Sequence, residues 1–258
     1  MVVLDNLEQG TQEWLIARAG RITASRAAEF SAPASLSPFP DIEIIKEGKV
    51  NRCEYNGKVY EHTRKTDLQN MVRLDLPKVY SDMRNGYMHE LIGQVCTGMI
   101  KEQARFKQAD WGHEYEEVAR AAFAFKSGLE VSEVGFIYKD DQKRAGISPD
   151  GIVGNFEAGL ELKCPFDTKY HIEFLVSEKI KPEYIEQCQF SMWVTGFSKW
   201  YFGSYDPRMT KLEKRMHYVE ILRDESFMKK YDDAYSVFIK EMDDKLKSIG
   251  FKFSNIYA

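Results

Sequence analysis

The sequence predicts an α/β fold in which a central mixed β-sheet is flanked by helices. Two observations predict it. A compact run of short, apolar, strand-like segments occupies residues 131–163, whereas the segments on either side have the apolar spacing of amphipathic helices. A chain of 258 residues can bury one substantial core without needing two domains, so we expect a single domain over residues 1–258.

The first part of the chain alternates helical and irregular patterns. Residues 8–30 favour a helical segment, and a Ser-, Ala- and Pro-rich stretch at about 31–41 is typical of a loop. Residues 42–60 favour short strands. Asn56-Gly57 predicts a hairpin turn among them, because both residues tolerate the left-handed backbone of a two-residue turn.

The rest of the chain is more regular. Gly98 and Gly128 each follow a helical pattern, in the position where glycine commonly ends a helix. The expected helices cover residues 84–98, 111–126, 182–195 and 226 to about 249. The expected strands cover residues 131–138, 144–147, 151–153, 160–163, 200–205 and 217–222.

The composition is that of an ordinary soluble protein, with 43% hydrophobic and 29% charged residues. No apolar run approaches the roughly 18 residues that a membrane span needs, and the N-terminus does not have the pattern of a signal peptide. The four cysteines are scattered and fit neither a disulfide framework nor a zinc site. We therefore expect a cytoplasmic protein with no membrane partner.

The net charge of −4 is only a weak argument against nucleic acid binding, because net charge says nothing about how the charges are distributed. Basic residues gather at 18–26, 101–107 and 208–215, each of which can also be a solvated face. A basic channel on an acidic exterior would reconcile the two observations.

Two carboxylates and a lysine form the candidate catalytic motif. Glu161 and Lys163 alternate with leucines on an expected strand, so they share one face while the leucines point into the core. A hairpin that folds back within residues 151–159 would bring Asp150 alongside Glu161. Paired carboxylates suit Mg²⁺, and a neighbouring ammonium can orient or deprotonate water, which suits metal-assisted phosphodiester cleavage. Strings of this kind also occur by chance, so the surrounding residues decide.

Other residues have both an ordinary and a functional interpretation. Glu116 is either a solvated helix residue or a third carboxylate of the metal site. Gln187 is either a common helix residue or an amide that holds water or a phosphate oxygen. Arg18, Thr23 and Ser25 lie where a turn enters a helix, and they form either a cap or an anion site.

Longer segments of the chain resemble the phage lambda exonuclease family, the viral recombinase group of the PD-(D/E)XK nucleases. The resemblance covers nearly the whole chain in one order and implies a restriction-endonuclease-like core. The matching segments are Trp14, 18–20, 22–25, 95–98, 111–116, 148–151, 160–166, 187–195, 205–209 and 249–251.

The resemblance implies a Mg²⁺-dependent exonuclease that degrades one strand of double-stranded DNA from its 5′ end. The products would be mononucleotides and a 3′ single-stranded tail for phage-type homologous recombination. Two metal ions are implied, with Mn²⁺ as a substitute for Mg²⁺. DNA ends with a 5′ phosphate, a homotrimeric ring and a single-strand annealing partner are also implied, as is a phage or prophage protein in the bacterial cytoplasm.

The resemblance also assigns roles to individual residues. For metal binding it implies Asp150, Glu161, the Leu162 main-chain carbonyl and Glu116. For activation of the attacking water it implies Lys163, assisted by Gln187. For the 5′-terminal phosphate it implies Arg18, Ser25 and Ser148.

One departure from the family is an insertion at about residues 31–81, which leaves end preference and partner choice open. Two alternatives to the exonuclease remain. A PD-(D/E)XK endonuclease would cut a covalently closed circular duplex, which an exonuclease leaves intact. A non-cutting DNA clamp or recombination scaffold would have no need of the complete set of Asp150, Glu161 and Lys163.

Overall fold

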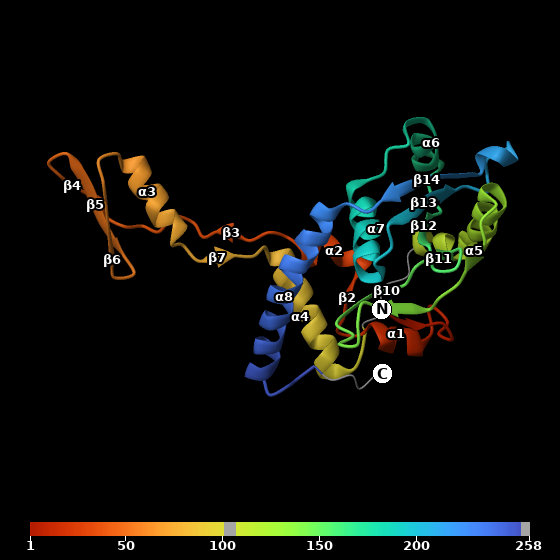
Figure 1. Cartoon of the computed structure of the whole chain (residues 1–258), viewed down its shortest axis with the longest axis horizontal. Helices are drawn as coiled ribbons and strands as arrows, with labels where there is room; N and C mark the ends of the chain where they lie inside the picture. Colours follow the sequence, from red (N-terminus) through yellow and green to blue (C-terminus); the bar gives the residue numbers. More distant parts are fainter. Residues whose placement is uncertain (101–106, 254–258) are drawn as a thin grey trace. The chain divides into compact units, whose positions relative to one another are not determined.

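The computed structural model describes residues 1–100 and 107–253, with only the backbone described at 107–110. Contacts between residues divide the chain into two compact units. The larger unit comprises Met1–Ser31 and Gly86–Ala258, and the smaller unit comprises Ala32–Asn85 (Figure 1). The smaller unit spans most of the stretch in which the sequence predicts an insertion, and the interpretation of the chain as one nuclease domain stays a prediction.

A five-stranded sheet forms the centre of the larger unit, with the strand order β14-β13-β12-β11-β8. Strands β12 and β13 run parallel, while the other neighbours run antiparallel, so the sheet is mixed. Its strands are β8 (Val131–Ser132), β11 (Gly151–Val153), β12 (Ala158–Lys163), β13 (Lys199–Tyr205) and β14 (Met216–Leu222).

A second sheet of four strands has the order β1-β9-β10-β2. Its strands are β1 (Val2–Leu4), β9 (Phe136–Tyr138), β10 (Ala145–Ile147) and β2 (Ile22–Thr23). The single strand expected over residues 131–138 is therefore wrong, because β8 and β9 belong to different sheets. The chain passes Leu7 closely at Gly135, where an added Cβ would lie 1.9 Å from the Leu7 carbonyl oxygen.

The observed helices match only in part those that the sequence predicts. The expected helix at 182–195 matches α7, and three others differ from their expected bounds by a few residues. The long helical segment expected over 8–30 is wrong, because Gly20 has a φ of 72° and β2 follows it. The helices are α1 (Gln12–Arg18), α2 (Ala27–Phe30), α4 (Asp82–Thr97), α5 (Lys107–Ser127), α6 (Thr168–Ser177), α7 (Pro182–Thr195) and α8 (Glu225–Ser248), with 3₁₀ turns at Ala24–Arg26 and Leu212–Lys214.

Helices α5 and α7 cover opposite faces of the five-stranded sheet (Figure 1). On one face, Leu160 and Leu162 pack with Phe123 of α5. On the other face, the Phe202 ring packs against those of Tyr184 in α7 and Phe174 in α6, with centroid distances of 5.5 Å and 5.3 Å. The sheet flanked by helices is thus as expected. No helix in the described part of the chain is both long and apolar enough to cross a membrane.

The smaller unit has its own sheet and core. Strands β4 (Ile45–Glu47), β5 (Val50–Tyr55) and β6 (Lys58–His62) form an antiparallel sheet that packs against α3 (Lys65–Leu74), a helix that the sequence did not predict. Asn56 and Gly57 have φ values of 50° and 76°, which confirms the predicted hairpin turn. Its buried side chains are Cys53, Tyr60, Leu68, Val72 and Leu76. A short ladder of β3 (Ser35–Leu36) and β7 (Lys78–Val79) joins the two arms of the chain.

Candidate active site

The hairpin of β11 and β12 brings the two motif carboxylates together. Gly151 lies opposite Leu160 in the ladder, which sets Asp150 alongside Glu161. The Asp150 N–H donates to the Leu160 carbonyl at 3.2 Å, and Asp150 Oδ2 accepts from the Leu162 N–H at 2.6 Å. The hairpin predicted from the sequence is therefore confirmed, and main-chain hydrogen bonds fix the position of the Asp150 carboxylate.

Lys163 contacts Glu161 on the same face of β12. The Glu161 side chain is only 3% exposed, and it accepts a hydrogen bond from Lys163 Nζ. The predicted alternation along β12 is confirmed, because the intervening Leu162 packs on the α5 side. Burial, opposed by the Lys163 charge and reinforced by that of Asp150, raises the pKa of Glu161 to about 7.

Glu116 of α5 joins the same electrostatic cluster. Burial and then the charge of Asp150 raise the Glu116 pKa above its ordinary value. Burial also raises the pKa of Asp150, in spite of the nearby Lys163 ammonium. The acidic groups of Asp150, Glu116 and Glu161 therefore lie within electrostatic reach of one another, and a cation would relieve their mutual repulsion.

Arg120, which the sequence did not single out, ties α5 to this cluster. Its Nε donates to the Asp150 carbonyl at 2.6 Å, and its Nη2 lies 3.3 Å from Glu116 Oε1. It also pairs with Glu133, and its side chain is only 12% exposed. The sequence signal for it is the spacing of four residues from Glu116, which places both on one face of a helix.

The face of α7 that covers β12 contributes two residues. Gln187 is half-buried, and burial and the charge of Glu161 raise the pKa of its neighbour Cys188, so this turn of α7 lies near the cluster. Within residues 1–100 and 107–253, no hydrogen bond joins the Gln187 side chain to the motif residues. Tyr184, which the sequence did not predict, has its ring centroid 5.0 Å from Lys163 Nζ.

Arg18 and Ser148, two of the three predicted phosphate-binding residues, are in contact. Arg18 Nη1 donates to Ser148 Oγ at 2.9 Å, and the Trp14 indole N–H donates to the same oxygen at 2.8 Å. The Arg18 guanidinium lies 4.3 Å from the Trp14 ring centroid, and burial lowers its pKa to about 10, so it stays charged at neutral pH. Ser25 is exposed on its 3₁₀ turn and takes no part in this arrangement. The sequence reasoning did not assign Trp14 a role.

The donor chemistry of the cluster suits a hard divalent cation, because carboxylate and carbonyl oxygens are the ligands such ions prefer. Among the described residues, no three His, Cys, Asp or Glu side chains converge into a complete metal site. The side-chain ligands would therefore be the pair Asp150, just before β11, and Glu161 of β12, and a small cation that keeps several waters fits such a pair.

Comparisons with known proteins extend these observations. Residues 13–198 match the model of the YqaJ-like viral recombinase domain. The protein ExoD of Escherichia coli (strain K12) is 47% identical over 76 residues, which cover 30% of this chain and 85% of that protein. An alkaline exonuclease (LHK-Exo) from Laribacter hongkongensis has a similar crystal structure, with a TM-score of 0.67, 29% identity and coverage of 93% of this chain and 96% of that one.

A phage related exonuclease from Haemophilus somnus 129PT has the same fold, with a TM-score of 0.60, 15% identity and coverage of 89% of this chain and 96% of that chain. The likeness to the alkaline exonuclease confirms the predicted PD-(D/E)XK nuclease fold. The family match includes every predicted site residue from Arg18 to Gln187. The resemblance found in the sequence is thus confirmed, and the chain belongs to the YqaJ-like viral recombinase family.

Proposed function

We propose that this protein is a Mg²⁺-dependent exonuclease that degrades one strand of double-stranded DNA in the 5′→3′ direction. The family and the alkaline exonuclease likeness support a phage-type exonuclease. The direction is supported by the loop between β10 and β11. That loop carries both Ser148, which is bonded to Arg18, and Asp150, which is part of the acidic cluster.

The short separation between Ser148 and Asp150 fits a DNA strand that is bound by its 5′ end. Ser148 and Asp150 are two positions apart, so their Cα atoms are separated by at most about 7 Å. A 5′-terminal phosphate bound by Arg18 would then place the next phosphodiester of the same strand beside Asp150. Arginine suits this role because its guanidinium binds phosphate oxygens with paired, charge-assisted hydrogen bonds.

The chemistry proposed is hydrolysis by a water that attacks in line with the departing oxygen. Bound Mg²⁺, or Mn²⁺ in its place, would make this water more acidic and neutralise the attacking and leaving oxygens. Asp150, Glu161 and the Leu162 main-chain carbonyl would hold metal, and Glu116 would complete the acidic cluster. Lys163 would orient or deprotonate the water, with Gln187 assisting from α7.

The proposal includes the assembly that the resemblance to the lambda exonuclease family implies. It comprises a homotrimeric ring through which DNA passes and a single-strand annealing protein that loads on the 3′ tail. A phage or prophage origin would place the protein in the cytoplasm of a bacterial host. These statements are supported by the resemblance alone.

The test uses a linear duplex with a 5′ phosphate and a label on one strand, incubated with and without Mg²⁺. Mg²⁺-dependent release of mononucleotides from the 5′ end, with an intact complementary strand, is the expected result. Release from the 3′ end would overturn the direction, and cutting of a covalently closed circle would indicate an endonuclease. DNA binding without cleavage would favour a scaffold. The Asp150→Ala variant is the control for contaminating nuclease.

A further inference from the structure

The chain crosses twice between the two sheets of the larger unit. The first crossing, residues 133–135, leads from β8 to β9, and the second crossing, residues 148–150, leads from β10 to β11. The second crossing carries Ser148, which accepts a hydrogen bond from Arg18, and Asp150 of the acidic cluster. A movement within this crossing would therefore change the distance between the proposed phosphate and metal sites.

Gln9 bridges the two crossings from the segment between β1 and α1. Its Nε2 donates to the Val134 carbonyl at 3.1 Å and to the Pro149 carbonyl at 3.0 Å. A side-chain amide nitrogen has two N–H groups, so this one side chain can hold both carbonyls at once. The middle residue of the second crossing is thus tied to the first crossing.

Arg120 of α5 makes a second bridge between the same crossings. Its Nη1 pairs with Glu133 of the first crossing, and its Nε donates to the Asp150 carbonyl of the second crossing at 2.6 Å. The Arg120 side chain is only 12% exposed, so water competes little for these donors. A guanidinium presents its donors in a rigid fork, and Arg120 therefore restrains both groups relative to each other.

We propose that Gln9 and Arg120 are positioning residues that fix the distance between the 5′-phosphate pocket and the metal-binding carboxylates. They thereby determine which phosphodiester is cut. The inference rests on the proposed function, in which Arg18 and Ser148 hold the 5′ phosphate. The position of Asp150 relative to that phosphate then decides whether the first or a later phosphodiester of the strand reaches the metal.

The other contacts of the second crossing do not fix this distance. The Asp150 N–H donates to the Leu160 carbonyl and its carboxylate accepts from the Leu162 N–H, so these bonds fasten Asp150 to β12 rather than to Ser148. Pro149 has no N–H with which to anchor the main chain between them. The bridge from Gln9 to the Pro149 carbonyl supplies a bond at this position.

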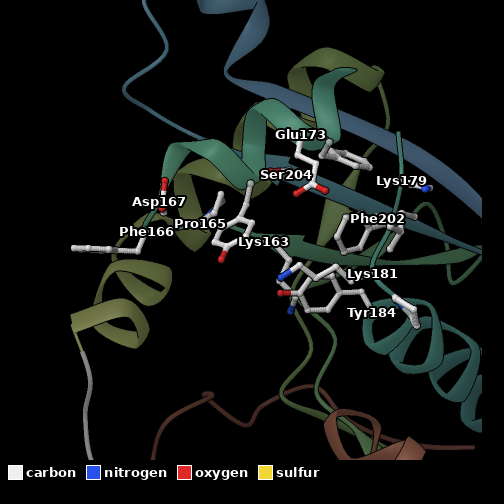
Figure 2. A pocket seen from close by; sticks show the side chains of 15 residues that line it. Lys163, Pro165, Phe166, Asp167, Glu173, Lys179, Lys181, Tyr184, Phe202 and Ser204 are labelled. Atoms are coloured by element: carbon white, nitrogen blue, oxygen red, sulfur yellow. The ribbon is translucent and has the colours of Figure 1, made fainter. Parts of the chain in front are cut away.

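The surroundings of the motif also make the bridges important. Lys163 and Tyr184 border a cavity of about 910 Å³ beyond the end of β12 (Figure 2). Support for the second crossing comes instead from the elements that carry Gln9 and Arg120. A loop between two sheets that is held by side chains from distant elements keeps one geometry, which is what a reacting group requires.

The test uses the full-length Gln9→Met and Arg120→Lys variants. Gln9→Met keeps the length of the side chain and removes both donors, whereas Arg120→Lys keeps the positive charge and removes the fork. The matched controls are Gln142→Met, in the exposed turn between β9 and β10, and Arg223→Lys, between β14 and α8. The Arg223 guanidinium likewise bonds one main-chain carbonyl and one carboxylate.

Two quantities are measured. Hydrogen exchange of residues 148–153 in EDTA, followed by mass spectrometry, reports opening of the second crossing. Single-turnover cleavage with Mg²⁺ is then compared on duplexes that differ only in a 5′-phosphate or a 5′-hydroxyl end. Mass spectrometry of the released products gives their length.

Both variants should exchange faster in residues 148–153 than wild type by about 2- to 10-fold, as loss of a hydrogen bond implies. Their cleavage rate on the 5′-phosphorylated duplex should fall by about 10- to 100-fold, since a displacement of about 1 Å can have such an effect. The unanchored 5′-hydroxyl duplex should lose less, and dinucleotides should join the products. The two controls should match wild type in every measurement.

A purely structural role of Gln9 and Arg120 would slow cleavage of both duplexes equally and leave mononucleotides as the products, which would overturn the proposal. Exchange equal to that of wild type in both variants would also overturn it. The exchange measurement requires no cleavage. A failure of the proposed function would instead appear as the absence of Mg²⁺-dependent mononucleotide release by the wild type, so the two failures are distinguishable.

Discussion

Ionisation of the buried Glu161 carboxyl makes the stability of the folded chain depend on pH. Its side chain is buried, and its pKa rises from 4.5 to about 7 on folding. Between these values the folded chain binds more protons than the unfolded chain at this residue. Stability therefore falls as pH rises, because ionisation of the buried carboxyl is less favourable in the folded state.

We expect the free energy of unfolding without divalent cations to fall between pH 4.5 and pH 7, by up to about 3 kcal/mol from this residue. Urea denaturation in EDTA across this range measures the decline, and the Glu161→Gln variant should flatten it. Mg²⁺ should stabilise the wild type more at pH 8 than at pH 5, since a carboxylate ligand must be ionised. An unchanged slope in Glu161→Gln would contradict the assignment.

Replacement of Lys163 should impair catalysis alone, whereas replacement of Asp150 should impair both metal binding and catalysis. Lys163→Ala should lower kcat on the order of 10²–10⁴-fold, the range typical of a lost acid–base group, while Mg²⁺ binding is retained. Asp150→Ala should abolish both metal binding and turnover. Calorimetric titration with Mg²⁺ and single-turnover cleavage measure the two quantities separately. Loss of Mg²⁺ binding in Lys163→Ala would show that the ammonium is needed to arrange the ligands.

Arg18 should determine the preference for a 5′ phosphate. Arg18→Ala is expected to reduce the kcat/KM ratio between 5′-phosphorylated and 5′-hydroxyl ends by about 10- to 100-fold, as loss of a hydrogen bond to a charged group implies. The matched control is Arg26→Ala, because Arg26 ends the 3₁₀ turn Ala24–Arg26 and pairs with Glu29 and with Glu90 of α4. An unchanged preference in Arg18→Ala would refute the phosphate assignment.

Local patterns account for most of what the sequence predicts of the elements. Helix α7 matches its expected bounds because its apolar spacing is regular and Gly196 ends it with a φ of 79°. Helix α6 was missed, since two of its apolar side chains, Ile172 and Val176, are exposed and interrupt the pattern of a buried face. The distribution of strands between two sheets depends on contacts such as that at Gly135, which no local pattern contains.

In the candidate site, too, local patterns predict some residues, whereas packing between distant segments places the others. Asp150, Glu161 and Lys163 could be placed together because one hairpin carries them all. Arg120 lies 30 positions from Asp150, and Trp14 lies 134 positions from Ser148, so their hydrogen bonds follow from packing of α5 and α1 rather than from spacing. The sequence therefore predicts the reactive groups better than it predicts the residues that hold them.

The parallel pairing of β12 with β13 depends on the absence of a side chain at Gly159. An added Cβ would lie 2.1 Å from Trp200 Cη2, and Trp200 is fully buried. Gly159→Ala should lower the free energy of unfolding by about 1–3 kcal/mol or more through overpacking. Gly93→Ala, at an exposed position of α4, meets no atom within 4 Å and should raise the free energy of unfolding by up to about 1 kcal/mol. Chemical denaturation of both variants checks the opposite signs, and a neutral Gly159→Ala would refute the close contact.

At the scale of the whole molecule, a short two-stranded ladder connects residues 38–76 of the smaller unit to the rest of the chain. Strands β3 and β7 pair, and the Ser37 N–H donates to the Pro77 carbonyl at 3.1 Å. The chain therefore departs and returns at adjacent points. The buried cluster of the smaller unit lies within residues 53–76, and the clusters of the larger unit use none of these residues.

Residues 38–76 should accordingly be removable. The ladder already holds Ser37 next to Pro77, so a short Gly/Ser linker can join these two residues. Closing this short loop costs little conformational entropy. We expect the shortened protein to fold with a similar melting temperature and to keep the chemical step, because Asp150, Glu161 and Lys163 all belong to the larger unit. Thermal denaturation and single-turnover cleavage of a 5′-phosphorylated duplex measure the two properties. An unfolded product would show that the larger unit needs the smaller one to fold, and a folded but inactive product would show that residues 38–76 supply part of the active site.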